Sequence, residues 1–257
     1  MSHTSIPLVV LDTNEQTTTP IVSNSLLVDE IKDVLVEHVV IAPSSSSTDA
    51  SADGNKTIYL FFKGAGVAVA ENKHYEIVPE TILLPNSVDR IAIESTGEGS
   101  LHYVKLSCKL SEQDLLDLEK LPVENTKNVY WAKFSDCPSY SEAIKSPNTI
   151  SRTILSNEYI PRVAMGTVHT KGPDKVAAHE HPMLEQLFLG LSENDCVVYA
   201  DDDQVAFPQN SILHIPLGSS HSVSVEENRT MYYVWMDFFL DKKGEEWLNT
   251  HKVDVNP

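Results

Sequence analysis

Cysteine is scarce in this chain, which has three in 257 residues: Cys108, Cys137 and Cys196. Three is an odd number and no Cys-x-x-Cys pair occurs, so neither a disulfide framework nor a cysteine-based zinc cluster is expected. Basic residues are also few, with 19 Lys and Arg against 37 Asp and Glu, and the formal net charge is −18. Such a charge disfavours binding to nucleic acid and to anionic membrane surfaces.

Long hydrophobic runs are missing as well. The sequence has no span of about 20 apolar residues, and its first residues show no basic region followed by an apolar run. We therefore expect a cytoplasmic protein with no membrane partner. A hydrophobic fraction of 41% predicts a normal packed core, and the length suffices for one large or two ordinary domains.

The densest group of metal-ligand residue types lies between residues 172 and 221. His179 and His181 are two residues apart, Glu185 follows four residues later, and His221 ends the sequence Pro-Leu-Gly-Ser-Ser-His. Residues two apart on a β-strand point to the same face, so both histidines can face one interior. A short turn can return Glu185 beside them, and the Pro-x-Gly turn can present His221 from a neighbouring strand. Two or three imidazoles with one carboxylate suit a first-row divalent metal that keeps open positions for substrate or oxygen.

This stretch resembles the two sequence motifs of the cupin family. The first motif reads His-x-His, three or four residues, then Glu, and the second reads Pro-x-Gly-x-x-His. The matching residues are His179, His181 and Glu185, then Pro216, Gly218 and His221. The chain departs from the family at Ser192 and Asn210, where cupins usually have Gly. The resemblance implies an all-β fold of double-stranded β-helix (jelly-roll) barrels. It also implies one divalent transition metal (Zn, Mn, Fe or Ni) held by His179, His181, Glu185 and His221.

The first half of the chain reads as a second, degenerate copy of such a barrel. Short β runs bounded by Gly, Asn and Pro turns fill residues 57–106, and Ile82–Asp89 parallels Ile212–His221 in kind, yet no His-x-His precedes it. We therefore expect a two-barrel protein, or bicupin. The expected domains are a metal-free N-terminal domain at 1–121, an interdomain segment at 122–160 and a metal-binding domain at 161–257.

Few helices are predicted. Ser111–Lys120 is the clearest, because Ser111 can cap its N-terminus and Asp114 completes a capping-box pattern. Ser25–Glu37 has apolar residues at helical spacing and predicts a second short helix. The polar stretch Ser44–Lys56 is expected to be a solvated loop.

The sequence identifies no catalytic base, but two aromatic residues are candidates for lining the substrate pocket. Tyr233 and Trp235 share one face of the last long strand and could line the metal cavity, although barrel core or subunit contact is an equal alternative. Glu185–Leu191 and the aromatic run Tyr232–Phe239 resemble the two-cupin uronate isomerases. That likeness implies a metal-dependent isomerase of a small sugar- or uronate-like substrate.

Two other functional classes compete with the isomerase. The same ligand set serves Fe- or Mn-dependent dioxygenases and decarboxylases. A non-enzymatic, metal-containing module that binds a small ligand fits one metal-binding and one degenerate barrel equally well. A homodimer is expected from the fold resemblance.

Overall fold

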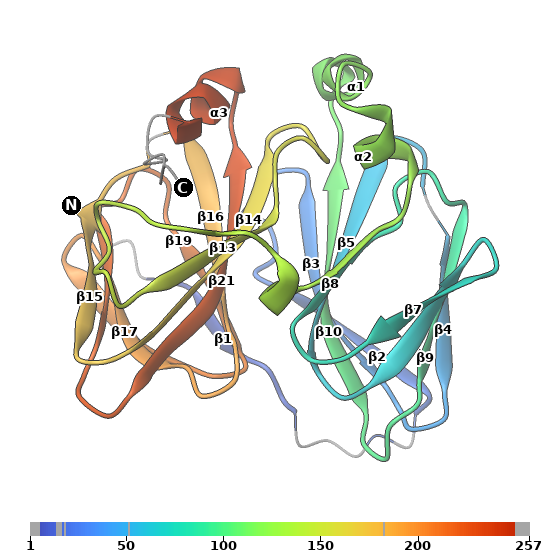
Figure 1. Ribbon diagram of the computed structural model, residues 1–257, viewed down its shortest axis with the longest axis horizontal. Coiled ribbons are helices and arrows are strands. Elements are labelled where there is room, and N and C mark those ends of the chain that lie inside the picture. The colour runs from blue at the N-terminus through green and yellow to red at the C-terminus, as the bar shows by residue number, and fades with distance from the viewer. Residues whose placement is uncertain (1–5, 14–16, 18, 51, 182, 250–257) are drawn as a thin grey trace. The chain divides into compact units, whose positions relative to one another are not determined.

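The structure is a computed structural model that describes all residues except 1–5, 14–16, 18, 51, 182 and 250–257. The strands form two compact units, each built from two antiparallel sheets (Figure 1). The N-terminal barrel contains Asp12–Asp136 and Glu158–Pro161. The C-terminal barrel contains the chain up to Leu11, Cys137–Asn157 and the chain from Arg162 onward. The prediction of two all-β barrels with few short helices is confirmed.

The N-terminal barrel has a six-stranded sheet in the order β11-β8-β5-β10-β3-β2 and a four-stranded sheet in the order β4-β9-β6-β7. Its strands are β2 (Ile21–Leu26), β3 (Val34–Ile41), β4 (Ser46–Ala50), β5 (Asn55–Lys63), β6 (Gly66–Ala70), β7 (Lys73–Ile77), β8 (Thr81–Leu84), β9 (Arg90–Ser95), β10 (Leu101–Lys109) and β11 (Tyr130–Lys133). Tyr59, Phe61 and Tyr103 are each 1% exposed, and their ring centroids lie 5.1 to 6.3 Å apart. Three large aromatic rings therefore occupy the middle of this core.

The C-terminal barrel has a seven-stranded sheet in the order β1-β19-β16-β21-β14-β13-β12 and a four-stranded sheet in the order β15-β20-β17-β18. Its strands are β1 (Leu8–Val10), β12 (Ser139–Tyr140), β13 (Ile150–Leu155), β14 (Val163–Lys171), β15 (Asp174–His179), β16 (Leu184–Gly190), β17 (Asp195–Ala200), β18 (Asp203–Pro208), β19 (Ser211–Ile215), β20 (His221–Val225) and β21 (Thr230–Phe239). Its interior is lined from both sheets: Phe188, Leu213 and Tyr233 come from the larger sheet, and Val198 and Val223 from the smaller. This shared core defines the interior face of each strand.

The helices are short, and the predicted capping box is present. α1 (Glu112–Leu118) begins after Ser111, whose hydroxyl accepts a hydrogen bond from the Asp114 backbone N–H, while the Asp114 carboxylate accepts one from the Ser111 backbone N–H. The helix predicted at Ser111–Lys120 is therefore confirmed. The other helices are α2 (Val123–Lys127), the 3₁₀ turn η1 (Phe134–Asp136) and α3 (Lys242–Asn249).

The helix expected at Ser25–Glu37 is wrong. Its residues contribute to strands β2 and β3, which pair with each other across a turn. In that turn Asp29 and Asp33 have φ of 64° and 62°, a left-handed conformation that a right-handed helix excludes. β3 also pairs with β10 over its whole length, and these sheet contacts outweigh the helical spacing of the apolar residues.

The stretch Ser44–Lys56 is not wholly a loop, as was expected. Ser46–Ala50 forms β4, which pairs with β9 at the edge of the four-stranded sheet. Exposed and half-buried residues alternate along β4, which is the pattern of an edge strand with one face in solvent. Because β4 consists almost entirely of polar residues, its sequence shows no alternation of apolar and polar residues that would predict a strand.

The two barrels are interleaved along the chain. β1, at the start of the sequence, pairs with β19 and so completes an edge of the C-terminal barrel. The segment Cys137–Asn157 also belongs to that barrel, through β12 and β13. The expected interdomain segment at 122–160 is thus divided between the two units.

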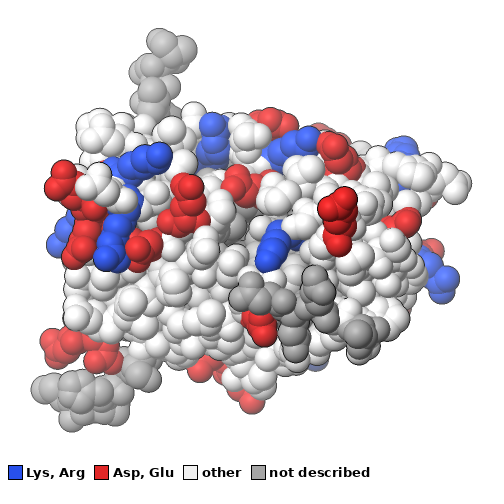
Figure 2. Space-filling model, turned by 90° about the horizontal axis from the view of Figure 1, so that it is seen from below, with Lys and Arg blue, Asp and Glu red and all other residues white. Residues whose placement is uncertain are grey.

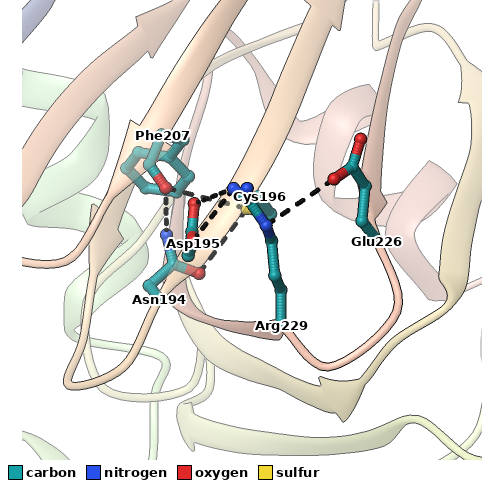
Figure 3. A network of polar contacts seen from close by, with 6 residues as sticks. All are labelled: Asn194, Asp195, Cys196, Phe207, Glu226 and Arg229. Atoms are coloured by element: carbon teal, nitrogen blue, oxygen red, sulfur yellow. Dashed lines mark hydrogen bonds and ion pairs between the residues drawn. The ribbon is translucent and has the colours of Figure 1, made fainter.

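A polar network fixes one end of the C-terminal barrel (Figure 3). The Asn194 side chain donates to the Phe207 carbonyl oxygen at 2.8 Å, and its oxygen accepts from the Cys196 thiol at 3.5 Å. Arg229 donates to both carboxylate oxygens of Asp195, at 2.9 and 3.0 Å. Burial raises the pKa of Cys196 to about 12, so this thiol stays protonated and acts as a structural residue.

Charged side chains of both signs share one face of the molecule (Figure 2). On the face shown in Figure 2, Lys and Arg side chains lie among Asp and Glu side chains. In the described part of the chain, every helix is too short or too polar to cross a bilayer. The expectations that the protein binds neither nucleic acid nor membranes stay predictions.

Candidate metal centre

Three histidines converge at one end of the C-terminal barrel. His179 ends β15 and pairs directly with His221, the first residue of β20, and His181 follows two residues after His179. One nitrogen from each ring can be chosen so that all three lie within 4.8 Å of one another. The ring centroids are 4.3 to 5.1 Å apart. Three of the four predicted ligands are therefore brought together.

The protonation states suit metal binding. His179 Nδ1 is 2.8 Å from the Ala177 carbonyl oxygen, and His221 Nδ1 is 3.3 Å from that of Ser219. Because a carbonyl oxygen can only accept, Nδ1 carries the proton in each ring and Nε2 keeps its lone pair. Such carbonyl contacts orient the histidine ligands of many metal sites.

His221 provides the test of whether a cation fits here. Its side chain is 2% exposed, and its Nε2 has no hydrogen-bond partner among the described residues. Burial, together with the neighbouring His179, lowers the pKa of His221 to about 3, so the ring is neutral at physiological pH. A buried, unpaired lone pair beside two other imidazoles fits a divalent transition metal.

Glu185, the fourth predicted ligand, lies elsewhere. Its carboxylate oxygen is 3.0 Å from His214 Nε2. Leu213 and Ile215 lie in the barrel core, so His214 between them points to the opposite face of β19. The structure therefore does not bring Glu185 together with the three histidines.

The next residue, Gln186, faces the barrel interior, where Glu185 was predicted to lie beside the histidines. Its side chain is buried, and its Nε2 donates to the Asp237 carboxylate at 2.7 Å. The sequence carried a signal for this, because the family motif allows four residues as well as three after the second histidine. Alternation from the buried Phe188 also places residue 186 on the interior face.

A second group of polar residues, most of them partly buried, comes from the segment Cys137–Asn157. Lys145 forms an ion pair with Glu142, and its Nζ donates to Ser151 Oγ at 3.1 Å. The same ammonium lies 5.5 Å from the centre of the Tyr140 ring. Burial lowers the pKa of Lys145, and the Glu142 carboxylate opposes that shift. Sequence reasoning missed these residues because it assigned their segment to an interdomain connection.

Asp237, on β21, lies close enough to Glu142 and Lys145 for both charges to act on its carboxyl group. It is 3% exposed, and burial raises the pKa of its carboxyl group to about 7, against the stabilising hydrogen bond from Gln186. The carboxyl group is therefore ionised above neutral pH and protonated below it.

The two predicted pocket residues have different surroundings. Tyr233 is 3% exposed and packs against Phe188 and Phe207, with ring centroids 4.7 and 5.9 Å away. Trp235 is half-buried and lines a small cavity that is open to solvent. The lining residues are Tyr140, Glu142, Thr153, Ser156, Asn157, Ala164 and Trp235.

Comparison with known proteins identifies the fold. No family model and no curated protein matches the chain. Among solved structures, protein YlbA from E. coli aligns with a TM-score of 0.68 at 12% identity, over 93% of each chain. A cupin 2 conserved barrel domain protein from Leptotrichia buccalis aligns with a TM-score of 0.59 at 16% identity, over 85% of this chain and 88% of the other.

A third similar structure is an oxalate decarboxylase, with a TM-score of 0.62 at 11% identity, over 92% of this chain and 77% of the other. At these identities the likeness concerns the fold and carries no information on substrate or reaction. The chain therefore has the fold of cupin-type proteins, with its histidine cluster in the C-terminal barrel.

Proposed function

We propose that the C-terminal barrel is the catalytic centre of a metal-dependent enzyme that isomerises a small polyhydroxy carbonyl compound. The observation that carries this proposal is the convergence of His179, His181 and His221, with the His221 Nε2 lone pair buried and unpaired among the described residues. A divalent cation bound there would polarise a carbonyl or hydroxyl oxygen of the substrate.

The substrate class that we propose is the one that the side chains lining the small cavity at Trp235 could bind. Its lining combines two aromatic rings, Tyr140 and Trp235, with the polar side chains of Glu142, Thr153 and Asn157. Aromatic faces pack on the C–H surface of a sugar, while the polar groups can hydrogen-bond its hydroxyls. A sugar- or uronate-like compound is therefore the substrate that we favour.

Glu142 is the residue that we propose as the general base. It lines the cavity, and its ion pair with Lys145 holds the carboxylate in place. The carboxylate would take the proton from the carbon next to the carbonyl and return it to the former carbonyl carbon. A hydroxyl proton would move to the carbonyl oxygen, so the two carbons exchange oxidation level and no other reactant is consumed.

An Fe- or Mn-dependent dioxygenase or decarboxylase is the second candidate. The histidine cluster favours it, because three imidazoles leave coordination positions free for oxygen and a chelating substrate. A metal-containing module without turnover would keep its cation but alter no substrate. A homodimer remains part of the proposal and is tested by size-exclusion chromatography with light scattering.

Solvent deuterium exchange separates these functions. Protein loaded with Mn²⁺, Zn²⁺, Fe²⁺ or Ni²⁺ is incubated in D₂O with a panel of aldoses, ketoses and uronates, and C–H exchange is followed by NMR. Metal-dependent exchange that is lost in His221→Ala and in Glu142→Gln supports the isomerase. Oxygen uptake or carbon dioxide release without exchange supports the second candidate, and retained metal with none of these signals supports the binding module.

A further inference from the structure

Gln186 faces the same interior as the histidine cluster. On β16 it shares a face with Phe188, which packs in the barrel core and whose ring centroid is 6.2 Å from that of His221. The register sets Gln186 between Asp237 on β21 and Ile215 on β19, and Ile215 belongs to the same core. Four residues of chain separate it from His181, so it lies at the end of the barrel where the histidines converge.

The amide of Gln186 is held at one end and unpaired at the other. Its Nε2 donates to Asp237 at 2.7 Å, whereas its Oε1 has no hydrogen-bond partner among the described residues, although the side chain is 6% exposed. A buried acceptor without a hydrogen-bond partner destabilises the fold. A cation in the interior would supply the missing partner.

We propose that Gln186 Oε1, and not a carboxylate oxygen of Glu185, is the fourth protein ligand of the metal. This inference rests on the proposed function, because it concerns the cation held by His179, His181 and His221. The same interior face carries two unpaired, buried ligand atoms, His221 Nε2 and Gln186 Oε1. Glu185 is excluded because its carboxylate binds His214 on the opposite face of the sheet.

Asp237 is the positioning residue for this ligand. Its carboxylate oxygen accepts the hydrogen bond from Gln186 Nε2, so the nitrogen end of the amide faces Asp237 and the oxygen end is left for the cation. A partner that orients a ligand in this way commonly changes metal affinity by about 10- to 100-fold when removed.

Cobalt titration tests the assignment without using turnover. Co²⁺ is titrated into metal-free protein at pH 8, and the affinity and the visible absorption bands are recorded. Gln186→Ala should weaken Co²⁺ binding at least about 10-fold and shift the bands. The control Glu185→Ala should change the affinity less than about twofold and leave the bands in place.

A double variant keeps the test decisive if Gln186→Ala does not fold. In Asp237→Asn alone, the new side-chain amide can donate a hydrogen bond to Gln186 Oε1. That bond should turn Gln186 Oε1 away from the cation and weaken Co²⁺ binding. Combining Gln186→Glu with Asp237→Asn exchanges carboxylate and amide, restores the hydrogen bond and presents a carboxylate oxygen to the cation. This double variant should bind Co²⁺ at least as tightly as the wild type.

Two results would overturn the inference. One is a folded Gln186→Ala protein with wild-type affinity and bands, and the other is loss of binding in Glu185→Ala but not in Gln186→Ala. A folded double variant that binds no Co²⁺ would also reject it. If the wild type itself binds no Co²⁺, every variant will behave alike, and the proposed function fails together with the inference.

Discussion

Gly166 is a position in the C-terminal barrel where one added methyl group should disturb the packing of both a strand and an aromatic ring. A Cβ atom there would lie 2.4 Å from the Arg152 carbonyl oxygen and 2.4 Å from Cζ2 of Trp235. Carbon contacts are optimal at about 3.5–4.0 Å, so both neighbours would have to retreat by roughly 1 Å. Arg152 belongs to the β13–β14 ladder, which resists that movement. We expect Gly166→Ala to lower the free energy of unfolding by about 3 kcal/mol, the upper end of the usual range for overpacking.

Urea unfolding followed by far-UV circular dichroism measures this loss, and tryptophan fluorescence reports the displacement of Trp235. Gly99→Ala is the control, since its Cβ would meet no atom within 4 Å, and it should stay within about 0.5 kcal/mol of the wild type. Adding Trp235→Phe to Gly166→Ala should restore part of the stability, because the Arg152 contact remains. A Gly166→Ala protein as stable as the Gly99→Ala control, with unchanged fluorescence, would refute the reasoning.

Three further predictions concern the rest of the molecule. Ser111→Ala should lower the free energy of unfolding by about 0.5–2 kcal/mol, because it removes the α1 cap; chemical denaturation checks this, and no loss would contradict the capping role. Burial lowers the pKa of Lys56 to about 8 from its usual 10.5. Between these two pH values the unfolded chain therefore holds more protons than the folded protein. The free energy of unfolding should rise with pH in this range, by at most about 1.4 kcal/mol per pH unit. Lys56→Met should remove this component from the slope of unfolding free energy against pH, and an unchanged slope would argue against it. Removing metal with EDTA, or by His181→Ala, should leave the far-UV spectrum unchanged, because two hydrophobic cores hold the fold. Unfolding of both samples would instead make the ion structural.

The predictable parts of the fold rest on local patterns. Ser111 and Asp114 form the capping box because the serine and the carboxylate lie three residues apart, a spacing that needs no knowledge of the tertiary structure. His179 and His221 were likewise identified from motif spacing, and strand pairing then set them opposite each other. Both features depend on residues close in sequence or joined by one strand pair.

The failures come from long-range contacts. Ser25–Glu37 has helical spacing, but pairing of β3 with β10, more than 60 residues away, decides its conformation. Glu185 and Gln186 differ by one position, and a shift of one residue reverses the face to which a side chain points. The position of Cys137–Asn157 in the C-terminal barrel depends on an edge strand that no local pattern marks.

Elemental analysis of protein purified without added metal, beside His221→Ala, tests the central claim most directly. The histidine cluster predicts about one Mn, Fe, Zn or Ni ion per chain in the wild type and loss of that ion in a variant that still folds. A wild type that holds no metal even after reconstitution, or a His221→Ala protein that keeps the ion, would contradict the account.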